Sequence, residues 1–166
     1  MKTILWATLT ANGNYARSHV QPPKPETLAD FADHVRQVGN FIVGRRTFEN
    51  FAAGGPNSPS PFAGVDIVVV SRQPLPLPAV APDPQAALAL LEAKGHQTAL
   101  ISGGETLHNA FLAAGLVDEL VLNIVPVLED RGLNILLREG DYRELRLLEQ
   151  RPLGSGIIQL RYALAR

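Results

Sequence analysis

The segment spanning residues 98–107 constrains the fold of this 166-residue chain more than any other. A short apolar run ends in Ser102-Gly103-Gly104, and from Thr106 onward apolar residues recur with helical spacing until Gly115. A strand that turns through glycines into a helix leaves backbone N–H groups and the positive end of a helix dipole free for an anion. Glycine is also the default residue of a tight turn, so the remaining sequence must separate a phosphate site from a plain turn.

The composition indicates one domain over residues 1–166, because 46% hydrophobic residues suffice for one sizeable core at this length. A net charge of -1 gives no electrostatic reason to expect nucleic acid or a membrane surface as a partner. No apolar run approaches the roughly 20 residues of a membrane span, and the N-terminus does not resemble a signal peptide, so we expect a cytoplasmic protein. Without cysteine, and with four scattered histidines, the sequence predicts no metal site.

Short apolar runs alternate with helical patterns along most of the chain, whereas the last third reads as a β-hairpin around residues 153–156. Strands that are apolar on both faces are typical of a sheet covered by helices on both sides. The prediction is an α/β fold with a mixed, mostly parallel sheet and a C-terminal antiparallel hairpin. We expect strands at residues 4–10, 41–43, 67–70, 99–101, 120–127, 144–150 and 157–163, helices at 28–38, 48–51, 85–94 and 106–114, and loops at 14–26, 54–61 and 75–84.

Three strand ends carry glycine, arginine or hydroxyl residues. In an open α/β sheet, ligands bind where parallel strands deliver their carboxyl ends, and arginine pairs with phosphate oxygens bidentately. The Rossmann and P-loop motifs are both absent. The sequence therefore predicts a site for a dinucleotide that bears an additional phosphate on its adenosine ribose. The three segments are Gly44-Arg45-Arg46-Thr47, Ser71-Arg72 and Ser102-Gly103-Gly104-Glu105-Thr106.

These motifs, in this order, resemble the dihydrofolate reductase-like superfamily, which includes the reductase domain of the bifunctional riboflavin-biosynthesis deaminase–reductase. The resemblance covers most of the chain. It implies a three-layer sandwich of the dihydrofolate reductase type and NADPH as the hydride donor. It rests on residues 6–10 with Asn12-Gly13, residues 41–49, 70–72 and 101–104, and residues 117–120 leading to Pro126.

Carried over by position, the resemblance assigns most of the motif residues to NADPH. Ala7 and Thr8 would offer backbone groups to the nicotinamide carboxamide, and Ala16 would lie over the nicotinamide ribose. The adenosine 2′-phosphate would lie beside Ser71 and Arg72. The remaining phosphates would be held by Gly44, Arg45, Arg46, Thr47, Ser102, Gly103, Gly104, Glu105, Thr106 and Leu107.

The substrate half of the site is expected between Trp6, Asp30 and Asn123. Dihydrofolate reductases carry a carboxylate near the start of the first helix that helps to protonate the pterin, and Asp30 is the nearest match, with Glu26 and Asp33 as competitors. A partly buried carboxyl there is expected to have a raised pKa and to deliver a proton. The alternative for Asp30 is an exposed residue favoured by the helix dipole. Asn123 is either a second catalytic residue or an amide hydrogen-bonded within the core.

The substrate side departs from the riboflavin-type pattern. Those reductases show Asp-Gly after the first strand and Asp-Asp-Pro after the Gly-x-x-Thr block, where this chain has Asn12-Gly13 and residues 51–55. Residues 129–132 also stand where many relatives carry a glycine pair. The leading hypothesis is a reductase similar to 5-amino-6-(5-phosphoribosylamino)uracil reductase, acting on a small heterocyclic substrate of pyrimidine or pterin type. The alternatives are a dihydrofolate reductase-like pterin reductase and a non-catalytic NADPH-binding module, and the relatives imply a possible homodimer.

Overall fold

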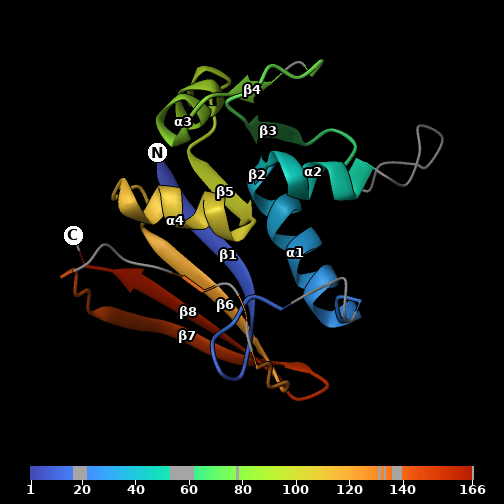
Figure 1. The fold of residues 1–166 in the computed structure, drawn as a ribbon, viewed down its shortest axis with the longest axis vertical. Helices are drawn as coiled ribbons and strands as arrows, with labels where there is room; N and C mark the ends of the chain where they lie inside the picture. Colours follow the sequence, from blue (N-terminus) through green and yellow to red (C-terminus); the bar gives the residue numbers. More distant parts are fainter. Residues whose placement is uncertain are drawn as a thin grey trace.

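The computed structural model describes residues 1–16, 22–52, 62–77, 79–130, 132, 134–135 and 140–165. Within them, the strands form one sheet in the order β4-β3-β2-β5-β1-β6-β8-β7 (Figure 1). The strands are β1 (Lys2–Thr10), β2 (Asn40–Gly44), β3 (Asp66–Val70), β4 (Val80–Ala81), β5 (Thr98–Gly103), β6 (Glu119–Val125), β7 (Leu145–Gly154) and β8 (Ile157–Leu164). The helices are α1 (Pro25–Val38), α2 (Arg45–Ala52), α3 (Pro84–Ala93) and α4 (Glu105–Ala113).

The sheet is parallel from β4 through to β6 and antiparallel at its other end. β1 lies between β5 and β6 and is parallel to both. β8 then runs antiparallel to β6, and β7 antiparallel to β8, so the two last strands form the hairpin at the lower left of Figure 1. The predicted mixed sheet with a C-terminal hairpin is confirmed.

Helices cover both faces of the sheet. Side chains of α3 and α4 pack with Leu5 and Ile101 on one face, where Phe111 of α4 is fully buried. Phe31 of α1 packs on the opposite face, in a core that also takes in Phe41. In Figure 1, α4 crosses in front of β1 and β5. Successive side chains of β1 point to opposite faces of the sheet and so contribute to both cores, as expected for a central strand. The three-layer prediction is confirmed.

Several element boundaries differ from the prediction. β4 lies inside the segment predicted as a connector, because two residues between prolines give no readable strand pattern. α1 begins at Pro25, inside the predicted loop 14–26, since proline suits the first turn of a helix. β6 ends at Val125, two residues before the predicted end. The predicted loop at 54–61 lies outside the described residues, and no described helix is both long and apolar enough to cross a membrane.

Candidate functional site

Two strand-to-helix turns pack against each other at the carboxyl edge of the sheet. β2 and β5 are parallel neighbours, and each reaches its helix through glycine. A Cβ atom on Gly44 would lie 3.7 Å from the carbonyl oxygen of Gly103, and one on Gly104 would lie 3.2 Å from Thr47 Oγ1. The second distance is too short for an ordinary contact, so a larger residue at Gly104 would push the turns apart. The structure brings both predicted glycine turns together.

The start of α4 faces this edge without a side-chain cap. Gly104 occupies the N-cap position in extended conformation and has no side chain that could accept a hydrogen bond from the first turn. Gly103 has φ +123° and joins Gly104 through a cis peptide bond. The carboxylate of Glu105 accepts a hydrogen bond of 2.7 Å from Asn109 Nδ2, one turn further along. Uncapped N–H groups at the positive end of a helix fit a phosphate group.

The predicted arginines lie near the same edge but outside the cavity beside it. β3 neighbours β2 in parallel, so Ser71 and Arg72 follow a strand that ends on the same side as the glycine turns. Arg46 and Arg72 are exposed, and Arg45 lies 3.8 Å from the carboxylate of Glu49. Exposed guanidinium groups at a sheet edge can approach phosphates of a bound ligand from solvent.

A cavity of about 260 Å³ opens beside the glycine turns, at the carboxyl ends of β1 and β5. Its walls come from β1, the start of α4, the segment after β1 and the first half of α1. Seven residues assigned to the cofactor line it: Ala7, Thr8, Ala16, Thr47, Ser102, Gly103 and Gly104. Ten other predicted site residues lie outside its lining: Asp30, Gly44, Arg45, Arg46, Ser71, Arg72, Glu105, Thr106, Leu107 and Asn123.

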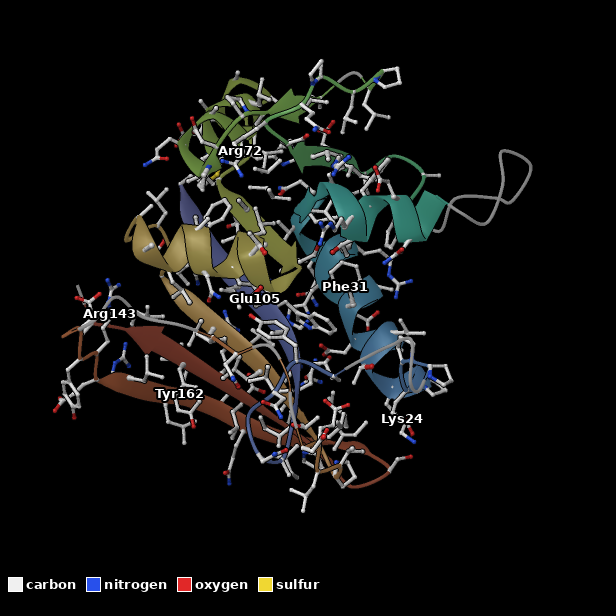
Figure 2. The ribbon with its side chains drawn as sticks, in the orientation of Figure 1. Lys24, Phe31, Arg72, Glu105, Arg143 and Tyr162 are labelled. Atoms are coloured by element: carbon white, nitrogen blue, oxygen red, sulfur yellow. The ribbon has the colours of Figure 1, made fainter. Side chains whose placement is uncertain are left out.

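The wall opposite α4 is aromatic and comes from α1 and β1. The rings of Trp6 and Phe31 lie 5.0 Å apart, and both line the cavity. Thr27 also lines the cavity, and Lys24, labelled in Figure 2, extends this wall to the start of α1. An apolar wall with few polar groups suits a flat heterocycle, which can stack on aromatic rings.

Asp30 lies behind this wall at the centre of a buried hydrogen-bond network. Its side chain belongs to a residue only 4% exposed, so the alternative of an exposed residue is wrong. Oδ2 accepts bonds of 2.7 Å from Trp6 Nε1 and from Gln159 Nε2, and lies 3.4 Å from His34 Nδ1. Oδ1 accepts a bond of 2.5 Å from the guanidinium of Arg151. We name these five residues the Asp30 network.

The expected rise in the pKa of Asp30 is also wrong. Burial raises the pKa of this carboxyl, but the hydrogen bonds from His34, Trp6 and Gln159 outweigh burial and hold it below its ordinary value. The same contact raises the pKa of His34. The carboxyl is therefore ionised at neutral pH and its oxygens are occupied by donors. Proton delivery by Asp30 stays a prediction, but this setting favours a role in positioning its neighbours.

Asn123 borders the network from β6. It is fully buried, and its Oδ1 accepts a hydrogen bond of 2.8 Å from Gln159 Nε2. Its Nδ2 has no hydrogen-bond partner among the residues that the structure describes. Asn123 lies opposite Thr8 in the β1–β6 pairing, and Thr8 lines the cavity. The bond to Gln159 agrees with the alternative of an amide bonded within the core, and a catalytic role for Asn123 stays a prediction.

A second polar group, the pair of Tyr15 and His108, lies on the α4 side of β1. Tyr15 Oη lies 2.6 Å from Nδ1 of His108, and both residues line the cavity. Burial of His108, which is 1% exposed, lowers the pKa of its imidazole to about 3, and the Ile101 carbonyl only partly opposes this effect. Burial raises the pKa of Tyr15 above its ordinary range, and the nearby Glu105 carboxylate adds a smaller effect in the same direction.

Sequence reasoning missed both members of this pair and three members of the Asp30 network. His108 follows the glycine turn by four residues, but a lone histidine in a helix carries no spacing signal. Arg151 and Gln159 lie in the hairpin, 121 and 129 residues from Asp30 in sequence. Their alternation on β7 and β8 placed them on one face of the hairpin, but nothing in the sequence indicated what that face contacts.

The family comparison agrees with this fold. The model of the RibD C-terminal domain family matches residues 7–158. No curated protein sequence matches the chain significantly.

Solved structures share the fold at low sequence identity. A putative riboflavin biosynthesis protein from Shewanella sp. PV-4 is 20% identical with a TM-score of 0.79, and the alignment covers 100% of both chains. A pyrimidine reductase-like protein from Corynebacterium diphtheriae is 16% identical with a TM-score of 0.76, over 99% of this chain and 92% of the other. Acinetobacter baumannii RibD is 18% identical with a TM-score of 0.73, and the match covers 99% of this chain and 58% of that one.

Proposed function

Because the chain belongs to the RibD C-terminal domain family, we propose that it is a reductase that uses NADPH to reduce a small heterocyclic substrate. The substrate that the family favours is 5-amino-6-(5-phosphoribosylamino)uracil, the pyrimidine of riboflavin biosynthesis. A pterin of the dihydrofolate type is the other candidate. A cytoplasmic location belongs to the same proposal.

The observation that carries the proposal is the contact between the two glycine turns. A Cβ atom on Gly104 would lie 3.2 Å from Thr47 Oγ1, so the turns leave room for backbone and a ligand but not for a side chain. Together with the uncapped start of α4, this arrangement fits the pyrophosphate of a dinucleotide. Gly44, Thr47, Gly103 and Gly104 would hold the phosphates, and Arg72 the 2′-phosphate.

The nicotinamide end would lie in the cavity, beside the backbone of Ala7 and Thr8 and under Ala16. When bound, the reduced nicotinamide supplies hydride. Residues of this chain bind and orient the substrate between the ring of Trp6 and the start of α1, and the cavity walls limit the access of water. The Asp30 network would hold the Trp6 ring in place, since Trp6 Nε1 is bonded to Asp30.

A specific observation also favours a second candidate, a non-catalytic NADPH-binding module. The Asp30 carboxyl has a lowered pKa and is occupied by donors, so it is a poor proton source. A module of this kind would bind the dinucleotide but would not oxidise it.

NADPH absorbance distinguishes the two candidates. The protein is mixed with NADPH and with the aminouracil phosphate or dihydrofolate, and oxidation of NADPH is followed. We expect oxidation with the aminouracil phosphate. Saturable NADPH binding without oxidation by either substrate would favour the module instead.

The preference for NADPH over NADH tests the role of Arg72. Removing a guanidinium that pairs with the 2′-phosphate is expected to weaken NADPH binding about tenfold and to leave NADH binding unchanged. Arg36→Ala is the matched control, because Arg36 is exposed and pairs with Asp33 on the far end of α1. An Arg72→Ala protein that still prefers NADPH would remove Arg72 from the proposed site.

The homodimer expected from the relatives is part of this proposal too. β7 is the edge strand of the sheet, and it carries leucines at positions 145, 147 and 148 that are 41%, 49% and 37% exposed. An exposed edge strand with apolar side chains is a ready pairing surface. Analytical ultracentrifugation tests this: a monomer at micromolar concentration would contradict the dimer.

A further inference from the structure

The reduction proposed above requires one proton in addition to hydride. Hydride adds to the carbon of a C=N or C=O bond, and the bonding pair moves to the nitrogen or oxygen, which must then take a proton. The obvious donor, Asp30, is ionised, lies outside the cavity lining and is bonded through both oxygens. A different donor is therefore needed at the cavity wall.

Among the described residues that line the cavity, four have titratable side chains: Tyr15, Lys24, Glu129 and His108. Lys24 is exposed at the start of α1. Glu129 follows β6 and lies beside the turn after β1, where its carbonyl oxygen accepts bonds from Asn12 and Asn14. The buried imidazole of His108 is neutral at pH 7, because its pKa is about 3. Only Tyr15 combines a proton held at neutral pH with a place beside the residues assigned to the nicotinamide.

The position of Tyr15 is fixed from two sides. It forms a β-bridge with Leu9 of β1, and the amide of the next residue, Ala16, donates a 3.2 Å bond to the carbonyl of Thr8. Its hydroxyl is held 2.6 Å from Nδ1 of His108. Thr8, Tyr15, Ala16 and His108 all line the cavity. The phenol therefore lies next to the backbone that the proposed function assigns to the reacting end of the cofactor.

The partner of Tyr15 suits a proton donor. A neutral imidazole has one N–H and one bare nitrogen, and the tautomer decides which of them faces Tyr15. His108 Nε2 makes no hydrogen bond of ordinary geometry, although the Ile101 carbonyl lies close enough to the imidazole to raise its pKa, so no full hydrogen bond at Nε2 fixes the tautomer. When Nδ1 carries the proton, it donates to Tyr15 Oη and leaves the phenol O–H free to point at a ligand.

We propose that Tyr15 is the proton donor of the reductase and that His108 is the positioning residue that holds and stabilises it. This assignment rests on the proposed function. The Oη–H bond of Tyr15 breaks, and its proton goes to the nitrogen or oxygen of the substrate as hydride reaches the adjacent carbon. The phenolate accepts a hydrogen bond from Nδ1–H of His108. Water that enters after product release returns the proton to Oη.

The test compares Tyr15→Phe with Tyr142→Phe, in full-length protein. Tyr142 is 82% exposed and lies outside the cavity lining, so it is the matched loss of a phenol hydroxyl. With NADPH and the aminouracil phosphate, Tyr15→Phe is expected to lower kcat by about 10²-fold or more, the range of a lost general acid. NADPH affinity should stay unchanged, which also shows that the variant is folded. Tyr142→Phe should match the wild-type protein in both measurements.

A second readout does not need turnover. Nitrogen-15 NMR of the histidine rings reports the bond at Nδ1 and the tautomer of each imidazole. We expect the His108 Nδ1 resonance to shift in Tyr15→Phe and not in Tyr142→Phe. His108→Gln should lower kcat less than Tyr15→Phe does, with KM unchanged, because it removes the support of the donor and leaves the donor itself.

The two possible failures have different signatures. An active wild-type protein whose Tyr15→Phe variant keeps its kcat would overturn the assignment of Tyr15 and leave the reductase intact. A wild-type protein that binds NADPH but oxidises none of it with the aminouracil phosphate or dihydrofolate would overturn the proposed function, and the proton donor with it. A His108 Nδ1 chemical shift that stays the same when the Tyr15 hydroxyl is removed would overturn the role of His108.

Discussion

Two polar groups flank β1, and they differ in charge and in the number of hydrogen bonds that each one makes. The Asp30 network on the α1 face holds an ionised carboxylate that accepts bonds from Trp6, Gln159 and Arg151. The Tyr15–His108 pair on the α4 face is neutral and has a single bond within it. Among the described residues, His108 Nε2 has no partner at ordinary hydrogen-bond geometry.

This difference indicates which group holds its neighbours in place and which group can transfer a proton. A buried charge costs free energy unless donors surround it, and a carboxylate surrounded in this way has little capacity left for a ligand. A neutral phenol with one partner keeps both a proton and a lone pair available on the cavity side. We therefore assign support of the aromatic wall to the first group and proton transfer to the second.

Breaking the Asp30 network should give the largest effect on stability. Asp30→Asn removes the charge and turns an amide toward buried donors, so we expect a loss of about 2–3 kcal/mol in the free energy of unfolding. This loss is smaller than is usual for a broken buried ion pair, because the Arg151 side chain is 46% exposed and can be hydrated. Urea denaturation measures it.

Asp33→Asn is the control for this change. Asp33 lies on the same helix, and its ion pair with Arg36 is exposed on both sides. Its loss should change stability by less than about 0.5 kcal/mol. Equal effects of the two substitutions would show that the network contributes no more than a surface pair.

Lowering the pH should affect the stability contributions of the two groups differently, because each group contains a histidine with a shifted pKa. The pKa of His108 is about 3 in the fold and about 6.5 in an unfolded chain, so between these values the unfolded state binds more protons. The contribution of His108 to the free energy of unfolding is fully present above about pH 6.5. It decreases as the pH falls, by about 2 kcal/mol at pH 5. His108→Gln should remove this loss, measured as the difference between urea denaturation at pH 7 and at pH 5.

His34 should act with the opposite sign. Its contact with Asp30 raises its pKa in the fold, so its contribution is present below the unfolded pKa and is lost as pH rises through the folded value. His34→Gln should therefore make the protein lose more stability between pH 7 and pH 5 than the wild type does. Parallel pH profiles for the two histidine variants would contradict the contrast between the groups.

Among the substitutions in the two polar groups and the glycine turns, Gly103→Ala should have the smallest effect on stability. Gly103 has φ +123°, a conformation that costs alanine about 1–2 kcal/mol. Gly95 has φ +88° with open space around it, so Gly95→Ala carries similar backbone strain far from the cavity. We expect similar losses of stability, but at least about a tenfold loss of NADPH affinity for Gly103→Ala alone. Calorimetry with NADPH titration measures both.

The sequence predicted the glycine turns better than the surroundings of Asp30 for a physical reason. The glycine turns at 44 and 103–104 are local, because a strand, a turn and a helix start occupy a few consecutive residues. Parallel pairing of β2 with β5 then brings those turns together without further information. The environment of Asp30 depends instead on residues of the hairpin more than a hundred positions away, and so the direction of its pKa shift was predicted wrongly.

Titration of the protein with NADPH, followed by the fluorescence of Trp6, tests the central claim most directly. Trp6 is the only tryptophan of the chain and it lines the cavity, so a nicotinamide bound there should quench its emission. We predict saturable quenching at one NADPH per chain, with weaker binding of NADH. Emission that does not respond to NADPH would contradict the assignment of this cavity to the cofactor, and an equal response to NADH would contradict the 2′-phosphate site at Arg72.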